Sequence, residues 1–273
     1  MAKGKDEHKM LFDLRGGRRG QVVKVVYALL AVLMGLSLFL VIGGFNLAEL
    51  FNSTSSTGDA AKPYEEQAER IEVKLKKDPD NPDLLLSLTR AQVSAGNAQV
   101  TVEPNGTQSF PVDAVQDYQE ANQTWSEYLK VTDEPNASLA LLMSPTLIKL
   151  AELARSYTEA DANLDAAVEA QRIVSEQRPS LNAFTTLAYY TYFTGDFAAA
   201  EKAEKEAKKL ASGKPEVEAI EKQLGTIEKN ARKYVAAKEK AEKEAKAAGG
   251  NGKPGAIEPG ENPFGGGAGL SGP

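Results

Sequence analysis

The chain of 273 residues is long enough for one medium-sized domain with additional segments, and it carries a formal charge of −6. It has no cysteine and a single histidine, His8, which excludes disulfides, thiol nucleophiles, histidine-based catalytic triads and multi-histidine metal sites. The glycine cluster at 265–267 follows no predicted strand and lacks the lysine of a phosphate-binding loop. We therefore expect no catalytic residues, no metal and no cofactor, and a protein that is not an enzyme.

The charge is unevenly distributed, because the first 24 residues are basic. They contain seven Lys or Arg and three Asp or Glu, a net charge of +4, which leaves −10 for the rest of the chain. An acidic body argues against nucleic acid as a partner, since phosphate binding needs clustered positive charge. The basic segment, residues 1–24, could contact anionic lipid headgroups.

Residues 25–46 are predicted to form a single transmembrane anchor. The stretch from Val25 to Phe45 has no charged residue and has the length of about 20 residues that crosses a bilayer. A cleaved signal peptide is the main alternative, but its apolar part is normally shorter, about 7–15 residues. The positive-inside rule places residues 1–24 in the cytoplasm and the remaining chain outside the cell membrane. Ala31 and Gly35 form a pair of small residues that would let another transmembrane helix approach closely.

The rest of the chain divides by composition. Residues 47–62 are polar and are predicted to form a flexible linker. Residues 63–235 are predicted to form an all-α domain, with apolar residues three or four apart and breaks at Pro or Gly. Within it, residues 98–112 alternate around Pro-Asn-Gly, which predicts a small β-hairpin or, alternatively, an unstructured insertion. Residues 236–248 lack an apolar stripe and are expected to be a solvated helix end, and the Gly/Pro-rich residues 249–273 a disordered tail.

Residues 181–210 carry a repeat-like pattern of large and small side chains. Small residues at set positions let two antiparallel helices approach, and a glycine ends the first of them. The residues that fill these positions are Phe184, Leu187, Ala188, the turn Gly195-Asp196-Phe197, Ala200 and Ala207. This pattern resembles the tetratricopeptide repeat (TPR), a helix pair that stacks into solenoids. Thr191 and Glu204 depart from it, because aromatic residues are usual at their positions.

Weaker copies of the same pattern precede this repeat. Residues 81–97 and 113–131 resemble its first and second helices, separated by the predicted hairpin. Residues 137–154 and 164–179 resemble a further pair, with Pro145 standing in the way of the first helix. Residues 215–235 are expected to form a helix that caps the array. The resemblance covers most of residues 63–212 and implies a TPR-like α-solenoid with a concave, peptide-binding groove.

An aromatic stripe in the clear repeat is the candidate for that groove. At about 100° per residue, Tyr189, Tyr192 and Phe193 fall opposite the framework residues, so they either line the groove or are covered by the next helix. The candidate groove residues are Asn182, Thr185, Tyr189, Tyr192 and Phe193. Thr185 and Tyr189 replace the Lys and Asn of TPRs that bind acidic tails, so a less charged segment is expected as the partner.

The overall layout resembles the membrane-anchored TPR proteins of bacterial envelopes, among them the ancillary TPR subunit of the Sec translocon. This resemblance implies a scaffold or holdase that binds protein or peptide partners on the outer side of the membrane and assists protein export. A structural organiser of a cell-wall or division complex is the alternative. The sequence does not determine the oligomeric state.

Overall fold

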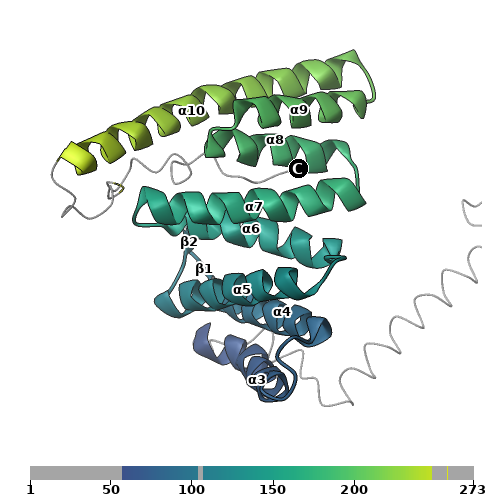
Figure 1. Ribbon diagram of the computed structural model, residues 1–273, viewed down its shortest axis with the longest axis vertical. Helices are drawn as coiled ribbons and strands as arrows, with labels where there is room; N and C mark the ends of the chain where they lie inside the picture. The colour runs from purple at the N-terminus through teal and green to yellow at the C-terminus, as the bar shows by residue number, and fades with distance from the viewer. Residues whose placement is uncertain (1–56, 104–106, 248–256, 258–273) are drawn as a thin grey trace, which may run out of the picture. The chain divides into compact units, whose positions relative to one another are not determined.

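The computed structural model describes residues 57–103, 107–247 and 257 of the chain. This part is all-α, as predicted: it is 82% helical, with eight helices, and it is compatible with a helical solenoid. Figure 1 shows that the helices of residues 57–247 lie side by side in the order of the sequence, from α3 to α10.

The helices are α3 (Thr57–Leu75), α4 (Pro82–Gln99), α5 (Val112–Val131), α6 (Ala137–Leu153), α7 (Tyr157–Gln177), α8 (Leu181–Thr194), α9 (Phe197–Lys209) and α10 (Lys214–Ala247). Two short strands, β1 (Thr101–Val102) and β2 (Gln108–Ser109), pair in antiparallel register between α4 and α5. The predicted hairpin in residues 98–112 is therefore confirmed, although residues 104–106 lie outside the described part of the chain.

Local side chains determine where most helices begin. A short polar side chain before the helix accepts hydrogen bonds from the backbone N–H groups of the first turn, which have no partner inside the helix. These capping residues are Asn81 for α4, Asn136 for α6, Ser156 for α7, Ser180 for α8 and Asp196 for α9. Helix α8 ends at Gly195, whose φ of 89° lies in the left-handed region that glycine adopts without strain.

Adjacent helices pack through small residues. Helices α4 and α5, α6 and α7, and α8 and α9 form closely packed pairs, α3 packs on α4, and α10 packs on α8. Ala188, Ala200 and Ala207 are all fully buried, at the positions where the repeat pattern predicts close approach of the helices. Trp125 is 1% exposed and belongs to the hydrophobic core.

Two features of the helices differ from the predictions. Helix α3 begins at Thr57, so residues 57–62, predicted as the end of the linker, are helical, and Ala61 in this turn is fully buried. Helix α6 continues through Pro145, which was expected to interrupt it. The fully buried side chains of α6, which lie on both sides of this proline, offset the lost backbone hydrogen bond; they include Leu139, Met143 and Leu147.

The end of α10 also differs from the prediction of a solvated helix end at residues 236–248. The helix is continuous to Ala247, and most of its last residues are exposed. However, the Lys238 ammonium lies 2.7 Å from the Asp161 carboxylate of α7, and Ala241 packs against the hydrophobic core. The first turns of this segment are therefore attached to the body.

The remaining predictions fall on other parts of the chain. The basic segment 1–24, the anchor 25–46 with Ala31 and Gly35, and the first part of the linker lie outside the described residues, as does the tail 249–273 apart from Ile257. Within the ranges that the structure describes, none of the helices combines the length and the hydrophobicity needed to cross a bilayer.

Candidate functional site

One face of α6 is exposed or half-buried along the helix, in contrast to the buried residues of the other faces. It consists of Ser138, Leu141, Pro145, Lys149 and Glu152, which are three or four residues apart and therefore lie along one side of the helix. We call this surface the α6 ridge. Leu141 is 51% exposed, whereas Leu139, Met143 and Leu147 on the other side of the helix are fully buried. A hollow lies on each side of the ridge.

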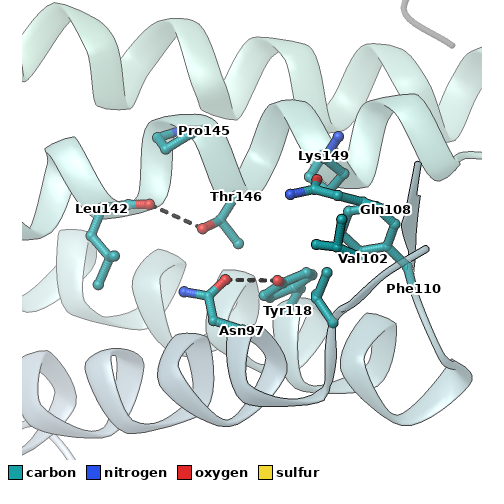
Figure 2. A pocket seen from close by; sticks show the side chains of 10 residues that line it. Asn97, Val102, Gln108, Phe110, Tyr118, Leu142, Pro145, Thr146 and Lys149 are labelled. Carbon is teal, nitrogen blue, oxygen red and sulfur yellow. Dashed lines mark hydrogen bonds between the residues drawn. The ribbon is translucent and has the colours of Figure 1, made fainter. Parts of the chain in front are cut away.

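The first hollow, called here the hairpin hollow, lies between the α4–α5 hairpin and α6 and has a volume of about 400 Å³. Figure 2 shows Phe110 and Val102 at the hairpin, Tyr118 on the α5 side, and Leu142 and Thr146 on α6. The residues that line the hollow are Asn97, Val100, Val102, Gln108, Phe110, Tyr118, Leu142, Pro145, Thr146 and Lys149.

Two contacts hold the walls of the hairpin hollow in place. The Tyr118 hydroxyl donates a hydrogen bond to Asn97 Oδ1 at 2.8 Å, which joins α5 to the end of α4 (Figure 2). The Lys149 ammonium lies 4.9 Å from the centre of the Phe110 ring, a cation–π contact between α6 and the hairpin. Burial raises the pKa of Tyr118 to about 12, with a further contribution from the charge of Asp117, so its hydroxyl stays protonated and keeps donating at neutral pH.

The second hollow, called here the α6–α8 hollow, has a volume of about 380 Å³ and adjoins the first at Pro145, which lines both. It is formed by α6, α7 and α8, and α8 contributes Asn182, Thr186 and Tyr190. The full lining is Leu141, Ser144, Pro145, Gln171, Val174, Arg178, Ser180, Asn182, Ala183, Thr186 and Tyr190. The two hollows and the ridge between them form one candidate groove.

A buried polar network forms the floor of the α6–α8 hollow. The Ser144 hydroxyl donates to Gln171 Oε1 at 2.8 Å, and the Gln171 amide donates to the Ala183 carbonyl at 3.0 Å. Tyr190 also forms a hydrogen bond with Ser144; burial raises the pKa of this tyrosine to about 12, against the lowering effect of that hydrogen bond. Because every link joins two of the three helices, the network fixes their relative positions beneath the hollow.

Pro145 gives the middle of the groove an unusual backbone. Proline has no N–H, so the carbonyl of Leu141 lacks the donor that it would have in an uninterrupted helix. Leu141 itself belongs to the α6 ridge and lines the α6–α8 hollow.

The structure brings only part of the predicted groove to this site. Asn182 is exposed and lines the α6–α8 hollow. Thr185 is buried, and its hydroxyl donates to the Leu181 carbonyl of its own helix at 2.8 Å. Tyr189 is half-buried beside Tyr190 and Phe193, with ring centres 5.4 Å away in both cases. Burial raises the pKa of Tyr189.

The assignment of Tyr192 and Phe193 to the groove is wrong. Tyr192 is 1% exposed, and its hydroxyl donates to Glu204 Oε2 of α9 at 2.8 Å. Phe193 is 3% exposed, and its ring lies edge-on to that of Tyr234 in α10, 6.1 Å between centres. Because α9 and α10 cover these aromatic rings, both residues are core packing residues.

The residues that the sequence analysis missed are Leu141, Leu142, Pro145, Tyr190 and the hairpin residues. A signal for the first three exists, since α6 is more apolar than one buried face requires and carries an interior proline. Tyr190 lies between the two faces of α8 in a helical projection, and no local pattern would have assigned it to a hollow. The hairpin was predicted, but its position against α6 was not.

Near the hairpin hollow, the pKa of the Asp117 carboxyl group differs clearly from its ordinary value. It accepts a hydrogen bond from the Gln99 amide at 2.8 Å. Its pKa is raised from 3.8 to about 6, mainly by burial and then by the negative charges of Glu120, Glu65 and Asp113. Since its neighbours are other carboxylates and an amide, we interpret this shift as a cost of packing α3, α4 and α5 together.

We expect the substitution Asp117→Asn to raise the free energy of unfolding at pH 7 by about 1 kcal/mol. The raised pKa means that the folded chain binds this proton more tightly than the unfolded chain does, so stability falls as the pH rises from about 4 through about 6. A fully buried group with this shift would contribute roughly 3 kcal/mol, and the partial exposure of Asp117 reduces that figure.

Urea unfolding at pH 7 and pH 4 checks this prediction. At pH 4 the gain from Asp117→Asn should shrink to about one fifth, because Asp117 is then protonated in the folded chain and partly protonated in the unfolded chain. Glu69→Gln, which changes an exposed carboxyl of α3, is the control and should have little effect at either pH. A gain of equal size at both pH values would show that charge is not the cause.

No protein-family profile, curated protein or solved structure matches this chain at a significant level. Functional inference therefore depends on the chain's own residues and geometry.

Proposed function

We propose that the chain is a membrane-anchored protein-interaction scaffold or holdase that acts on the outer side of the membrane. Its groove would bind extended, weakly charged segments of partner proteins, and the protein would not be an enzyme. The observation that carries the proposal is the pair of hollows that adjoin at Pro145 beside the exposed Leu141 of the α6 ridge. Concave apolar surfaces with a few fixed polar groups are typical of binding sites.

The apolar character of the groove supports a protein partner. Leu141 is 51% exposed and Val102 is 65% exposed, and each lines one of the hollows. Exposed apolar side chains that gather at one surface are typical of docking sites. A partner's apolar side chains would cover them and remove this area from water.

The charged groups of the groove support a weakly charged ligand. Lys149 pairs with the carboxylate of Glu152 on the same ridge. The Arg178 guanidinium donates to the Ser138 hydroxyl at 2.7 Å, at the start of α6. Because Lys149 is already paired with a carboxylate, it is poorly suited to hold an acidic tail, and apolar contact and backbone hydrogen bonds would supply most of the affinity.

The order of the helices supports a TPR-like solenoid. In a TPR array the first helix of each repeat lines the groove, and α4, α6 and α8 would be these first helices. All three contribute to the hollows: α4 through Asn97, α6 through Pro145 and α8 through Asn182. Helix α10 packs on α8 and would close the array, as a capping helix does.

The membrane anchor and the outward orientation of the domain are supported by the sequence alone. The apolar residues 25–46 would hold the chain in the membrane, and the basic residues 1–24 would remain on the cytoplasmic side. A groove anchored in this way would be placed where exported chains emerge.

The substitution Leu141→Gln is expected to weaken the binding of an unfolded client about tenfold. Leu141 lies on the ridge, so a bound segment would bury its side chain, and losing that burial costs about 1.5 kcal/mol of binding free energy. The measurement is fluorescence anisotropy of a labelled, carboxymethylated unfolded protein with the detergent-solubilised full chain.

The matched control is Leu210→Gln. Leu210 is 46% exposed, close to the exposure of Leu141, but it lies at the end of α9 and lines neither hollow. It should leave client binding unchanged, and neither substitution should alter the thermal midpoint appreciably because both side chains are exposed. Equal losses for the two variants, or no loss for Leu141→Gln, would contradict the groove proposal.

Photo-crosslinking in cells, from a probe at position 141, then tests the biological role. Crosslinks to the export channel and to emerging chains would support the holdase. Crosslinks to cell-wall synthases or division proteins would instead favour a structural organiser, the alternative that the same architecture allows.

A further inference from the structure

Ile257 is the one described residue after Ala247, and it contacts the helical body. Its backbone N–H donates a hydrogen bond to the carbonyl oxygen of Arg155, with a distance of 3.2 Å between nitrogen and oxygen. Its side chain is half-buried and packs against the hydrophobic core. The sequence predicts no structure in this part of the chain, so a backbone hydrogen bond together with an apolar contact is a specific attachment.

Arg155 lies in the turn between α6 and α7. It follows Ala154, which ends α6, and precedes Ser156, which caps α7. A carbonyl in such a turn has no helical donor, so it is free to accept from an added segment. The turn therefore offers a backbone acceptor of the kind that an extended peptide can use.

Rigid neighbours surround this turn. Tyr157, two residues after Arg155, is 5% exposed, and its ring centre lies 5.6 Å from that of Tyr234 in α10. The pair of Lys238 and Asp161 joins α10 to α7 at 2.7 Å near the same end of the helices. The acceptor is thus presented by three helices that are fixed to one another, as a preformed binding site requires.

We propose that the α6–α7 turn at Arg155 is a binding seat for an extended segment with an aliphatic side chain, and that Ile257 of the same chain occupies it. The seat is separate from the groove along the α6 ridge, and the proposal does not depend on the proposed function. A partner segment of the same chemistry would bind by displacing the chain's own tail. The chain's own Ile257 and a partner segment would therefore compete for the same seat, and this competition would regulate binding of the partner.

The length of the chain between helix and seat favours occupation by the same molecule. Residues 248–256 are the only residues that separate Ala247 from Ile257 in the sequence. Short tethers give effective concentrations of about 1 mM. A free segment that binds the seat with a dissociation constant of about 100 μM would therefore meet about tenfold competition from the tail.

The test uses a labelled synthetic peptide of residues 252–262, GKPGAIEPGEN, added to the detergent-solubilised full chain. Substituting Ile257→Asp in the chain empties the seat, so the variant should bind this peptide about tenfold more tightly than the native chain does. A peptide that carries the same Ile257→Asp change should bind neither chain. Leu270→Asp, which changes another aliphatic residue of the tail, is the matched control and should behave like the native chain.

Hydrogen exchange provides the second measurement. The amide of residue 257 should exchange slowly in the native chain and in Leu270→Asp, and quickly in Ile257→Asp. Equal peptide affinities for the native chain and Ile257→Asp, or no binding to either, would overturn the proposal. A concentration-dependent dimer that Ile257→Asp abolishes would overturn occupation by the same molecule, because the tail would then be exchanged between two chains.

Discussion

Replacing Trp125 with alanine is expected to lower the free energy of unfolding by about 3–5 kcal/mol. Trp125 is 1% exposed and is the largest fully buried side chain in the described part of the protein. Its ring stacks on that of Tyr128, 5.6 Å between centres. The Tyr128 hydroxyl in turn accepts a hydrogen bond at 2.9 Å from the N–H of Asn136, the capping residue of α6.

The large loss has two sources. Without the indole ring, the side chains around it would lose dispersion contacts, and the surrounding helices cannot move close enough together to restore them. Tyr128 would also lose the ring that orients its hydroxyl toward Asn136, so the turn between α5 and α6 would loosen. The effect should therefore extend beyond α5, to the first turn of the helix that carries the candidate groove.

Far-UV circular dichroism in urea measures this change, because Trp125 is the only tryptophan and its fluorescence is lost with it. Tyr64→Ala is the control, since Tyr64 is an aromatic residue that is 40% exposed on α3. It should cost less than about 1 kcal/mol. A loss below about 1 kcal/mol for Trp125→Ala would show that the core around α5 is not packed as described.

Adding a single methyl group at Gly96 is expected to destabilise the protein by about 1–3 kcal/mol. A Cβ at this position would lie 2.6 Å from Tyr118 Cε1 and 3.1 Å from the Ala114 carbonyl oxygen. Tyr118 is 3% exposed and held by its hydrogen bond to Asn97, so its ring has little room to move. Gly96 is therefore what allows α4 and α5 to approach this closely.

Gly225→Ala is the matched control for Gly96→Ala. Gly225 also lies inside a helix, α10, but a Cβ there would meet no atom within 4 Å. Alanine should stabilise that helix by about 0.5–1 kcal/mol, because glycine loses more backbone entropy on folding. Opposite signs for the two substitutions in urea unfolding are the expected result, and a gain in stability for Gly96→Ala would contradict the close packing.

Gly96→Ala should also change the candidate site. Tyr118 lines the hairpin hollow, so displacing its ring would reshape this hollow without altering the α6–α8 hollow. Client binding by the variant, measured at a temperature where it remains folded, would show how much the hairpin hollow contributes to affinity.

Local signals in the sequence were sufficient to predict where most helices begin and end. Ser180 and Asp196 cap α8 and α9 where the repeat pattern places helix starts, and Gly195 ends α8 in the left-handed conformation that the predicted turn requires. The Pro-Asn-Gly alternation likewise located the hairpin. These features depend on a few adjacent residues, which is why a sequence reveals them.

The helix boundaries that were wrong depended on distant contacts. Pro145 costs a helix about 3 kcal/mol when it removes a hydrogen bond and crowds the preceding turn. Helix α6 accepts that cost because buried side chains such as Leu139 and Leu147 keep the helix packed on both sides of the proline. Propensity alone predicts a break there, and tertiary packing overrides it.

The candidate site shows the same limit. A helical projection correctly separated Tyr192 and Phe193 from the framework side of α8, but it did not say what covers them. Contacts from α9 and α10 cover them. Helix α10 begins at Lys214, after the whole of α9, so no pattern within α8 could reveal this contact. Of the predicted groove residues, Asn182 is the one that lines a hollow.

The sequence by itself therefore determined the all-α class, most helix starts and ends, and the hairpin. Each of these follows from local backbone preferences and from the spacing of apolar residues that must leave water. Only the tertiary structure decided which face of α8 is covered, that α6 continues through Pro145, and that Leu141 stays exposed between two hollows. These outcomes depend on which helices meet, and residues far apart in the chain supply the contacts.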